Sequence, residues 1–184
     1  MITVKNLKKS FNGKVVFEGY DLCLPDKGMF YMTGPSGSGK TTLLRIIAGL
    51  DKDFEGTAEH DGVISYVFQE NRLIPSLTAY ENVYEVCHDK EKALEMLKQT
   101  GLSEDTDKYP PELSGGMNRR VSIARALSYE HDILLLDEPF TALDGEIKSA
   151  VISLIKELEK DRLVLLVSHD ESEAKALGCE RIGF

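Results

Sequence analysis

The chain has 184 residues, 42% of them hydrophobic, which is enough for one globular domain with a buried core. The formal net charge of −9 argues against a general nucleic-acid-binding surface, so no nucleic-acid partner is expected. Cys23, Cys87 and Cys179 are odd in number and far apart, which favours a reducing compartment over a disulfide framework. No apolar run approaches the length of a membrane span, and the N-terminus does not resemble a signal peptide.

The first predicted elements are extended. Residues 2–11 roughly alternate in character and predict a strand, and Asn12-Gly13 predicts a tight turn. Extended structure resumes at residues 15–17, and residues 20–24 predict a further strand. We therefore expect the chain to open with antiparallel β-structure.

The segment Gly-Pro-Ser-Gly-Ser-Gly-Lys-Thr at residues 34–41 fits the phosphate-loop pattern G-x-x-x-x-G-K-[ST]. An apolar strand is predicted before it, at residues 29–33, and apolar residues at helical spacing follow it. The glycines let backbone N–H groups turn toward phosphate oxygens, Lys40 would reach the β- and γ-phosphates, and the Thr41 hydroxyl would ligate Mg²⁺. The expected nucleotide-binding residues here are Gly34, Pro35, Ser36, Gly37, Ser38, Gly39, Lys40, Thr41 and Thr42.

The rest of the chain alternates between short apolar strands and helices. Buried strands are predicted at residues 63–68, 133–136 and 163–167. Helices are predicted at residues 79–87, 91–100, 117–128 and 147–158, a surface connection at 51–62 and a loop at 108–112. This alternation is typical of an α/β fold whose site lies along the carboxyl edge of a mostly parallel sheet.

Polar residues stand at the ends of three of these strands. Asp137 and Glu138 follow one strand, where the first carboxylate can lie near Mg²⁺ and the second can polarise an attacking water. His169 follows another and can contact a γ-phosphate, and the Gln69 amide can serve both the metal and the water. Each residue alone is also compatible with an ordinary polar strand end.

A second anion-binding helix start is predicted at Ser114-Gly115-Gly116. One chain holds one triphosphate on its phosphate loop, so this second start has no ligand of its own. A head-to-tail dimer would supply one, because the Ser-Gly-Gly of each subunit could cover the γ-phosphate held by the other.

In this order of motifs the chain resembles the nucleotide-binding subunit of an ABC transporter, over essentially its whole length. The motifs are Phe11 in the N-terminal β region, the phosphate loop, Gln69, residues 113–117, residues 133–138, residues 141–144 and His169. The resemblance implies ATP and Mg²⁺ as ligands, with Phe11 stacked on adenine, Asp137 on the metal through water, Glu138 as catalytic base and His169 as a γ-phosphate sensor. It also implies that Asp144 bridges a homodimer.

The resemblance implies a P-loop NTPase fold in a single ABC-type ATPase domain over residues 1–184. Its expected parts are an N-terminal antiparallel β region at 1–28, a P-loop core at 29–69 and 130–184, and a small helical subdomain at 70–129. The sequence of these motifs is most similar to that of ATPases of nitrate-, sulfonate- and taurine-type importers, in which methionine is usual at the position of Met117. Two departures are a short 51–62 segment and an end at Phe184, without the family's last strands.

The predicted function is a cytoplasmic ATPase, peripheral on the inner face of the cell membrane, that powers an importer by ATP-driven dimer closure. Permease subunits are expected to dock near residues 73–84, and a solute-binding protein is compatible with the complex. The alternatives are a soluble ABC-type ATPase in assembly or repair, and a P-loop kinase, for which residues 113–117 have no role. Whether the docking residues instead pack a small core stays open; they are Leu73, Ile74, Pro75, Leu77, Tyr80 and Tyr84.

Overall fold

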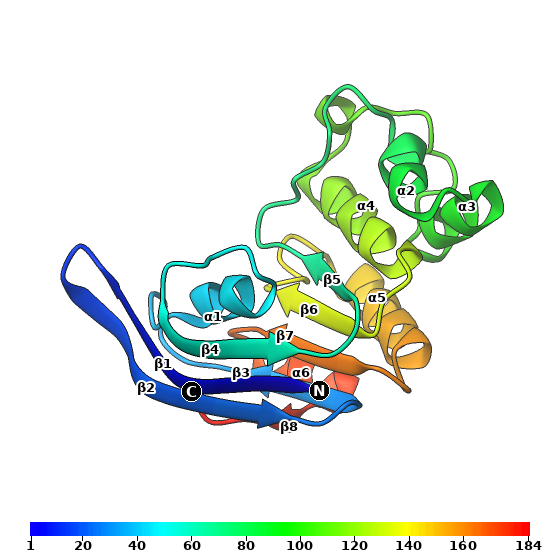
Figure 1. Cartoon of the computed structure of the whole chain (residues 1–184). Coiled ribbons are helices and arrows are strands. Elements are labelled where there is room, and N and C mark those ends of the chain that lie inside the picture. Colours follow the sequence, from blue (N-terminus) through cyan, green and yellow to red (C-terminus); the bar gives the residue numbers. More distant parts are fainter.

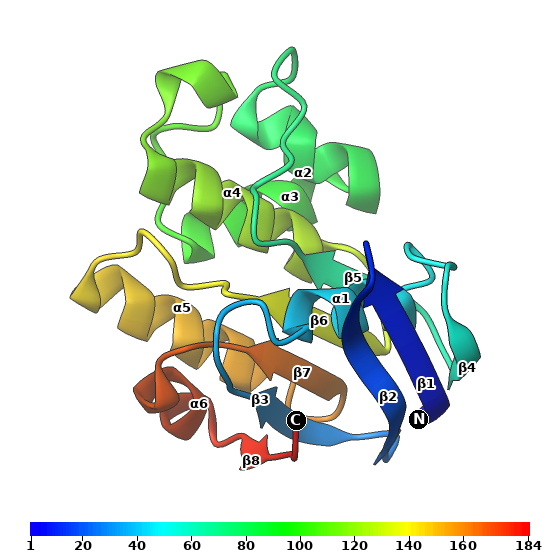
Figure 2. The ribbon, with the colours of Figure 1, turned by 90° about the vertical axis from the view of Figure 1, so that its left-hand side faces the viewer.

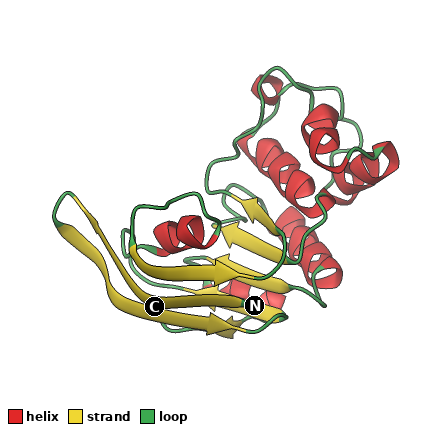
Figure 3. Cartoon of the chain, in the orientation of Figure 1, coloured by secondary structure: helices red, strands yellow, loops and turns green.

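The computed structural model describes residues 1–184 as two β-sheets with helices between and beside them (Figures 1 and 3). The larger sheet has the strand order β5-β6-β7-β3-β8, and every neighbouring pair in it is parallel. This confirms the predicted α/β class with a mostly parallel core sheet. Its strands are β3 (Gly28–Met32), β5 (Ile64–Val67), β6 (Ile133–Asp137), β7 (Leu163–Val167) and β8 (Glu180–Arg181).

The central strands are buried on both faces. In β6, Ile133 and Leu135 belong to one hydrophobic cluster, whereas Leu134 and Leu136 belong to the other. Successive side chains of a strand point to opposite faces, so a strand covered on both sides must be apolar throughout. This covering explains the uninterrupted apolar runs in the sequence.

The smaller sheet is antiparallel, in the order β2-β1-β4. Its strands are β1 (Ile2–Phe11), β2 (Lys14–Leu24) and β4 (Glu55–His60). Asn12 and Gly13 have φ values of 48° and 80°, which confirms the predicted tight turn between β1 and β2.

Two predictions for this sheet were wrong. The 15–17 and 20–24 segments form one continuous strand, β2, because shifts in its register with β1 accommodate Gly19 at φ 83°. Residues 51–62 are not only a surface connection, since they contain β4, which pairs with β1. The side chains of β4 are mostly exposed, so they carry no burial pattern, and backbone pairing alone makes the segment a strand.

The helices cover both faces of the parallel sheet. Helix α1 lies between the two sheets, and α5 and α6 pack on the opposite face of the larger one (Figure 2). Helices α2, α3 and α4 gather at one end of the molecule (Figure 1). The bounds are α1 (Lys40–Ile47), α2 (Ala79–Cys87), α3 (Lys90–Gln99), a 3₁₀ helix (Pro110–Glu112), α4 (Gly115–Ser128), α5 (Gly145–Leu158) and α6 (Glu171–Leu177).

The predicted helices are all present: α2 has the predicted bounds, and α3, α4 and α5 have shifted ends. Helix α4 begins two residues earlier than predicted, because the Ser114 hydroxyl accepts a hydrogen bond from the Met117 N–H and caps the first turn. Strand β8, which follows His169 and pairs with β3, was not predicted from the sequence. None of the helices combines the length and the apolar character needed to cross a membrane.

Candidate functional site

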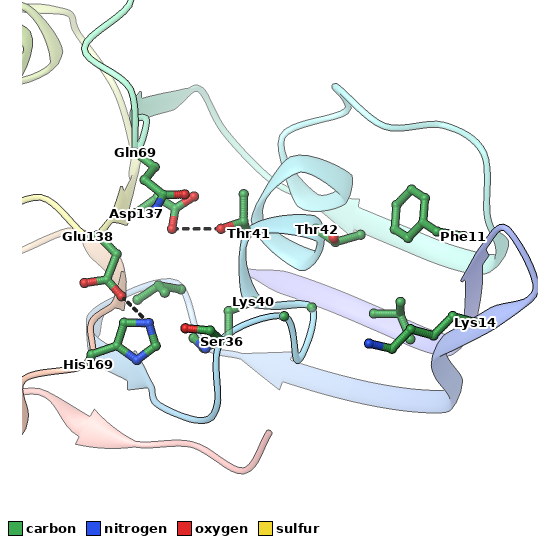
Figure 4. Close-up of a pocket in the computed structure, with 14 residues that line it drawn as sticks. Phe11, Lys14, Ser36, Lys40, Thr41, Thr42, Gln69, Asp137, Glu138 and His169 are labelled. Carbon is green, nitrogen blue, oxygen red and sulfur yellow. Dashed lines mark hydrogen bonds and ion pairs between the residues drawn. The ribbon is translucent and has the colours of Figure 1, made fainter.

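A cavity of ≈ 410 Å³ opens at the carboxyl edge of the parallel sheet, facing the β1–β2 hairpin (Figure 4). It combines the end of the phosphate loop with residues that follow three different strands. The lining residues are Phe11, Lys14, Val16, Ser36, Gly37, Gly39, Lys40, Thr41, Thr42, Gln69, Asp137, Glu138, Val167 and His169.

Gly39 fixes how the phosphate loop enters α1. It precedes the helix with φ 107°, and a Cβ atom built on it would lie 2.5 Å from Cγ1 of Val16. Only glycine fits both the left-handed backbone and this contact with β2. The start of α1 is thereby brought to the cavity, with its backbone N–H groups at the positive end of the helix dipole.

Lys40 is 5% exposed and its ammonium group lies inside its own loop. Its Nζ atom donates hydrogen bonds to the carbonyl oxygens of Gly34 and Pro35, at 2.8 and 2.9 Å. A third contact of Nζ, to the Ser38 hydroxyl, is 3.4 Å long. The positive charge is therefore held at the centre of a loop whose glycines suit phosphate.

Asp137 ends β6 beside the phosphate loop. The Thr41 hydroxyl donates to its Oδ1 atom at 3.1 Å, and the Tyr66 hydroxyl donates to Oδ2 at 3.3 Å (Figure 4). Burial raises the pKa of Asp137, while these two hydrogen bonds and the charges of nearby arginines lower it. The carboxylate is thus fixed at the edge where Gln69 also lines the cavity.

These donors fit a magnesium ion. The set consists of a threonine hydroxyl, a glutamine amide and one carboxylate, which are hard oxygen ligands. Nowhere in residues 1–184 do three or more histidine, cysteine, aspartate or glutamate side chains form a group that could hold a metal ion by themselves. Mg²⁺ is commonly held by one or two carboxylates together with substrate phosphates, and the arrangement matches that mode.

Glu138 lies beside His169 on one wall of the cavity (Figure 4). The Oε1 atom of Glu138 lies 3.2 Å from Nε2 of His169, yet it is buried and accepts no hydrogen bond of good geometry. Burial raises the pKa of Glu138, and the neighbouring His169 lowers it. A carboxylate with a raised pKa and a free lone pair is suited to accept a proton from water.

Phe11 lines the opposite wall at the tip of β1. Its side chain is 47% exposed, and the Lys9 ammonium lies 4.8 Å from the ring centroid. Lys14, its register partner on β2, and Val16 line the same wall. Neither was predicted from the sequence, and the signal that could have found them is their position directly across the Asn-Gly turn.

The remaining predicted residues lie elsewhere. Ser114, Gly115 and Asp144 are exposed outside the cavity; the Asp144 carboxylate accepts a hydrogen bond from the Ile147 N–H and caps α5. Gly116 lies close to the next loop, since a Cβ atom on it would be 2.7 Å from the Ala142 carbonyl oxygen. Gly34, Pro35 and Ser38 line a neighbouring hollow that also contains Phe184.

The family model for ABC transporters matches residues 17–141. The aliphatic sulfonates import ATP-binding protein SsuB 1 of Pseudomonas savastanoi pv. phaseolicola is 39% identical over 180 residues, which is 95% of this chain and 76% of that relative. The aliphatic sulfonates import ATP-binding protein SsuB of Corynebacterium glutamicum is 42% identical over 185 residues, which is 95% of this chain and 76% of that relative.

Solved structures give the same result. The dimeric structure of a post-hydrolysis state of the ATP-binding cassette MJ0796, bound to ADP and Pi, has a TM-score of 0.89 at 33% identity and covers 96% of this chain and 91% of its own. A second dimeric structure of MJ0796 has a TM-score of 0.87 at 34% identity, with the same coverage. The predicted P-loop NTPase fold is therefore confirmed. The chain belongs to the ABC transporter family, in which it is an ATP-binding ATPase subunit.

Proposed function

We propose that two copies of this subunit close around ATP and Mg²⁺, and that cycles of ATP-driven closure and hydrolysis power an importer. The observation that carries the proposal is the meeting of Lys40, Thr41, Asp137, Glu138 and His169 in one cavity. The names of the relatives favour import of a sulfonate-type solute, and membrane subunits are expected to select that solute.

Binding of ATP is assigned to the phosphate loop and the hairpin. The N–H groups at the start of α1 and the Lys40 ammonium would hold the phosphates, because both are positive and lie in the same loop. Phe11 would stack on adenine, since its half-exposed ring stands on the wall opposite the carboxylates. The ligand would thus extend across the cavity.

Hydrolysis is assigned to the strand ends. Thr41, Asp137 and Gln69 would hold Mg²⁺, which when bound would neutralise charge on the phosphates. Glu138 would take a proton from the attacking water, and His169 would orient this carboxylate and contact the γ-phosphate. Loss of the water proton and transfer of the γ-phosphoryl group to that water yield ADP and phosphate.

The Ser114–Gly116 turn and Asp144 are assigned to the partner's site. Ser114 and Gly115 are exposed at the start of α4, with no ligand-binding group beside them in their own chain. The relatives of known structure are dimeric, which supports a head-to-tail pair in which this turn covers the partner's nucleotide.

The test of the base is Glu138→Gln. We expect it to keep ATP binding and to stall hydrolysis, leaving an ATP-stabilised dimer on size-exclusion chromatography. Glu157→Gln, an exposed change on α5, is the matched control and should hydrolyse normally. Wild-type hydrolysis by Glu138→Gln would contradict the assignment.

The permease is proposed to dock beside residues 73–84. Ile74 is 47% exposed and Pro75 is exposed, which leaves an apolar patch after Gln69. Leu73, Tyr80 and Tyr84 are half-buried against the larger hydrophobic cluster, so packing explains part of this segment. The exposed part is the docking candidate.

An apolar groove of ≈ 380 Å³ supports the same kind of partner. It runs between β5 and α4, and both Leu50 and Tyr129, exposed by 58% and 41%, line it. Phe68, one residue before Gln69, lies in the same groove. A partner on this surface would therefore contact the segment that delivers Gln69 to the cavity.

The docking test is Ile74→Asp, with Leu158→Asp on α5 as a control of similar exposure. Because Ile74 is exposed, the purified chain should stay folded and hydrolyse ATP while co-purification with its permease is lost. If the Ile74→Asp chain still co-purifies with the permease, the patch is not the docking surface. A chain that binds no permease in any form would instead favour the alternative of an ATPase without a membrane partner.

The remaining assignments follow from this partner. A subunit bound to a permease lies on the inner face of the cell membrane, exposed to the cytoplasm, where ATP is available. An importer of this kind also works with a solute-binding protein. Cell fractionation, with and without the permease, checks the first assignment.

A further inference from the structure

Arg119 is a buried arginine in the second turn of α4, and it contacts no charged side chain. Its guanidinium donates hydrogen bonds only to backbone carbonyl oxygens of two loops outside its own helix. Nε donates to Pro139 at 2.7 Å, and Nη2 to Asp137 and Glu138 at 2.9 and 2.6 Å. Nη1 donates to Phe68, and to Gln69 at 3.3 Å.

The two loops are those that carry the proposed chemistry. One follows β5 and delivers Gln69, and the other follows β6 and delivers Asp137 and Glu138. The planar guanidinium of Arg119, with its fixed set of donors, therefore joins both loops from α4. No other side chain in residues 1–184 hydrogen-bonds to the backbone of both loops.

The hydrogen bond from Arg119 to the Glu138 carbonyl holds a residue whose backbone is strained. Glu138 has φ 48°, in the left-handed region that a residue with a side chain adopts at a cost. Its N–H donates to the Val167 carbonyl at 2.9 Å, and its own carbonyl accepts from Arg119. The peptide groups on both sides of Glu138 are thus tied, which fixes the direction of its carboxylate toward His169.

The charge of Arg119 is retained. Burial lowers the pKa of Arg119 to about 10, while Asp137 and Glu138 raise it, so the side chain is protonated at neutral pH. Charged donors give stronger hydrogen bonds to carbonyl groups than neutral donors do. This strength suits a group that must hold a strained backbone.

We propose that Arg119 is a positioning residue for hydrolysis: it holds Gln69 and Glu138 in register by joining the β5 and β6 loops. The proposal rests on the proposed function of Glu138 as the base. It assigns no contact with ATP, because Arg119 is buried and does not line the cavity.

The experiment compares Arg119→Met and Arg119→Lys with the wild-type chain. Methionine fills much of the space without a donor, and lysine keeps the charge but cannot span two loops from one nitrogen. We expect kcat to fall about 100-fold in both, the size of effect that a misplacement of about 1 Å produces. ATP affinity, measured by titration of the isolated chain, should change less than about twofold.

Arg120→Met is the matched control. Arg120 is a buried arginine on the same helix, and its Nη1 donates to the Thr100 and Gly101 carbonyls at 2.9 and 2.6 Å, away from the site. It should lower the melting temperature as Arg119→Met does, yet keep kcat when assayed below its melting temperature. Should Arg119→Met fail to fold, Arg119→Lys decides.

The outcomes separate this inference from the function on which it rests. An Arg119→Lys chain with wild-type kcat would overturn the positioning role, and so would an equal loss of kcat in Arg120→Met. Loss of ATP affinity by the same factor as kcat would overturn it as well. Glu138→Gln is assayed alongside: if that variant hydrolyses ATP normally, the base assignment fails instead.

Discussion

The N-termini of α1 and α4 are both suited to bind anions, but the side chains that surround them differ. Helix α1 opens into a cavity with two lysines, two carboxylates and a histidine around it. Helix α4 opens at an exposed serine and glycine, with Ser114 used to cap its own helix. The helix dipole is common to both, so the dipole alone does not make a catalytic site.

The difference fits the proposed division of work between two copies of the chain. In that proposal the α1 side binds phosphate and activates water, and the α4 side covers a phosphate already bound to the partner. Arg119 ties the two sides within one chain, since it lies on α4 and holds the loops of the α1 side.

The largest expected effect is from Lys40→Ala. Removal of the ammonium that the loop surrounds should weaken ATP binding and abolish turnover, because the phosphate charge would lose its principal cation. Titration with ATP and a phosphate-release assay measure both. Normal ATP affinity in this variant would show that the N-terminus of α1 binds ATP without Lys40.

Ser114→Arg should abolish turnover while leaving the ATP affinity of the isolated monomer nearly intact. The reason is that Ser114 is exposed and does not line its own cavity, so a large side chain there should block the partner's site. Loss of the cap on α4 should lower stability by about 1 kcal/mol without touching the ATP cavity of the same chain. A mixture with the Lys40→Ala chain should form dimers with at most one competent site. Loss of ATP binding by the monomer would place the α4 start in its own subunit's site.

Phe11→Ala should weaken ATP binding about tenfold, since stacking on a base contributes about 1–3 kcal/mol. Stability should change little because the ring is 47% exposed. Val15→Ala, on the same hairpin and 59% exposed, is the control for general effects on the strands. Equal ATP affinities of the Phe11→Ala and Val15→Ala chains would show that Phe11 does not contact the nucleotide.

The smallest effect expected is a shift of the acid limb of kcat. Burial raises the pKa of Glu138, so as pH falls this carboxylate takes up a proton before an ordinary glutamate would, and its action as a base is lost earlier. His169→Asn removes the neighbour that lowers this pKa and should move the limb to still higher pH. The kcat profile at saturating ATP checks both, and a limb at the ordinary glutamate value would contradict the assignment.

The sequence alone determined the phosphate loop, the central apolar strands and the polar residues that follow them. These features are local or periodic: a glycine-rich loop between a strand and a helix, and strands such as β6 and β7 buried on both faces. The rule that parallel strands present their carboxyl ends at one edge was enough to bring Asp137, Glu138 and His169 together. The resemblance to a known family supplied their expected roles.

Only the tertiary structure decided the features that depend on distant backbone. Strand β4 exists because β1 offers it an edge, and its exposed polar side chains carry no pattern that predicts it. In the sequence, nothing distinguishes Arg119 from any other basic residue of a helix. Its five carbonyl partners come from two loops that the fold brings to it. Hydrogen bonds to backbone leave no signature in the partner residues' side chains, so no sequence pattern could have indicated them.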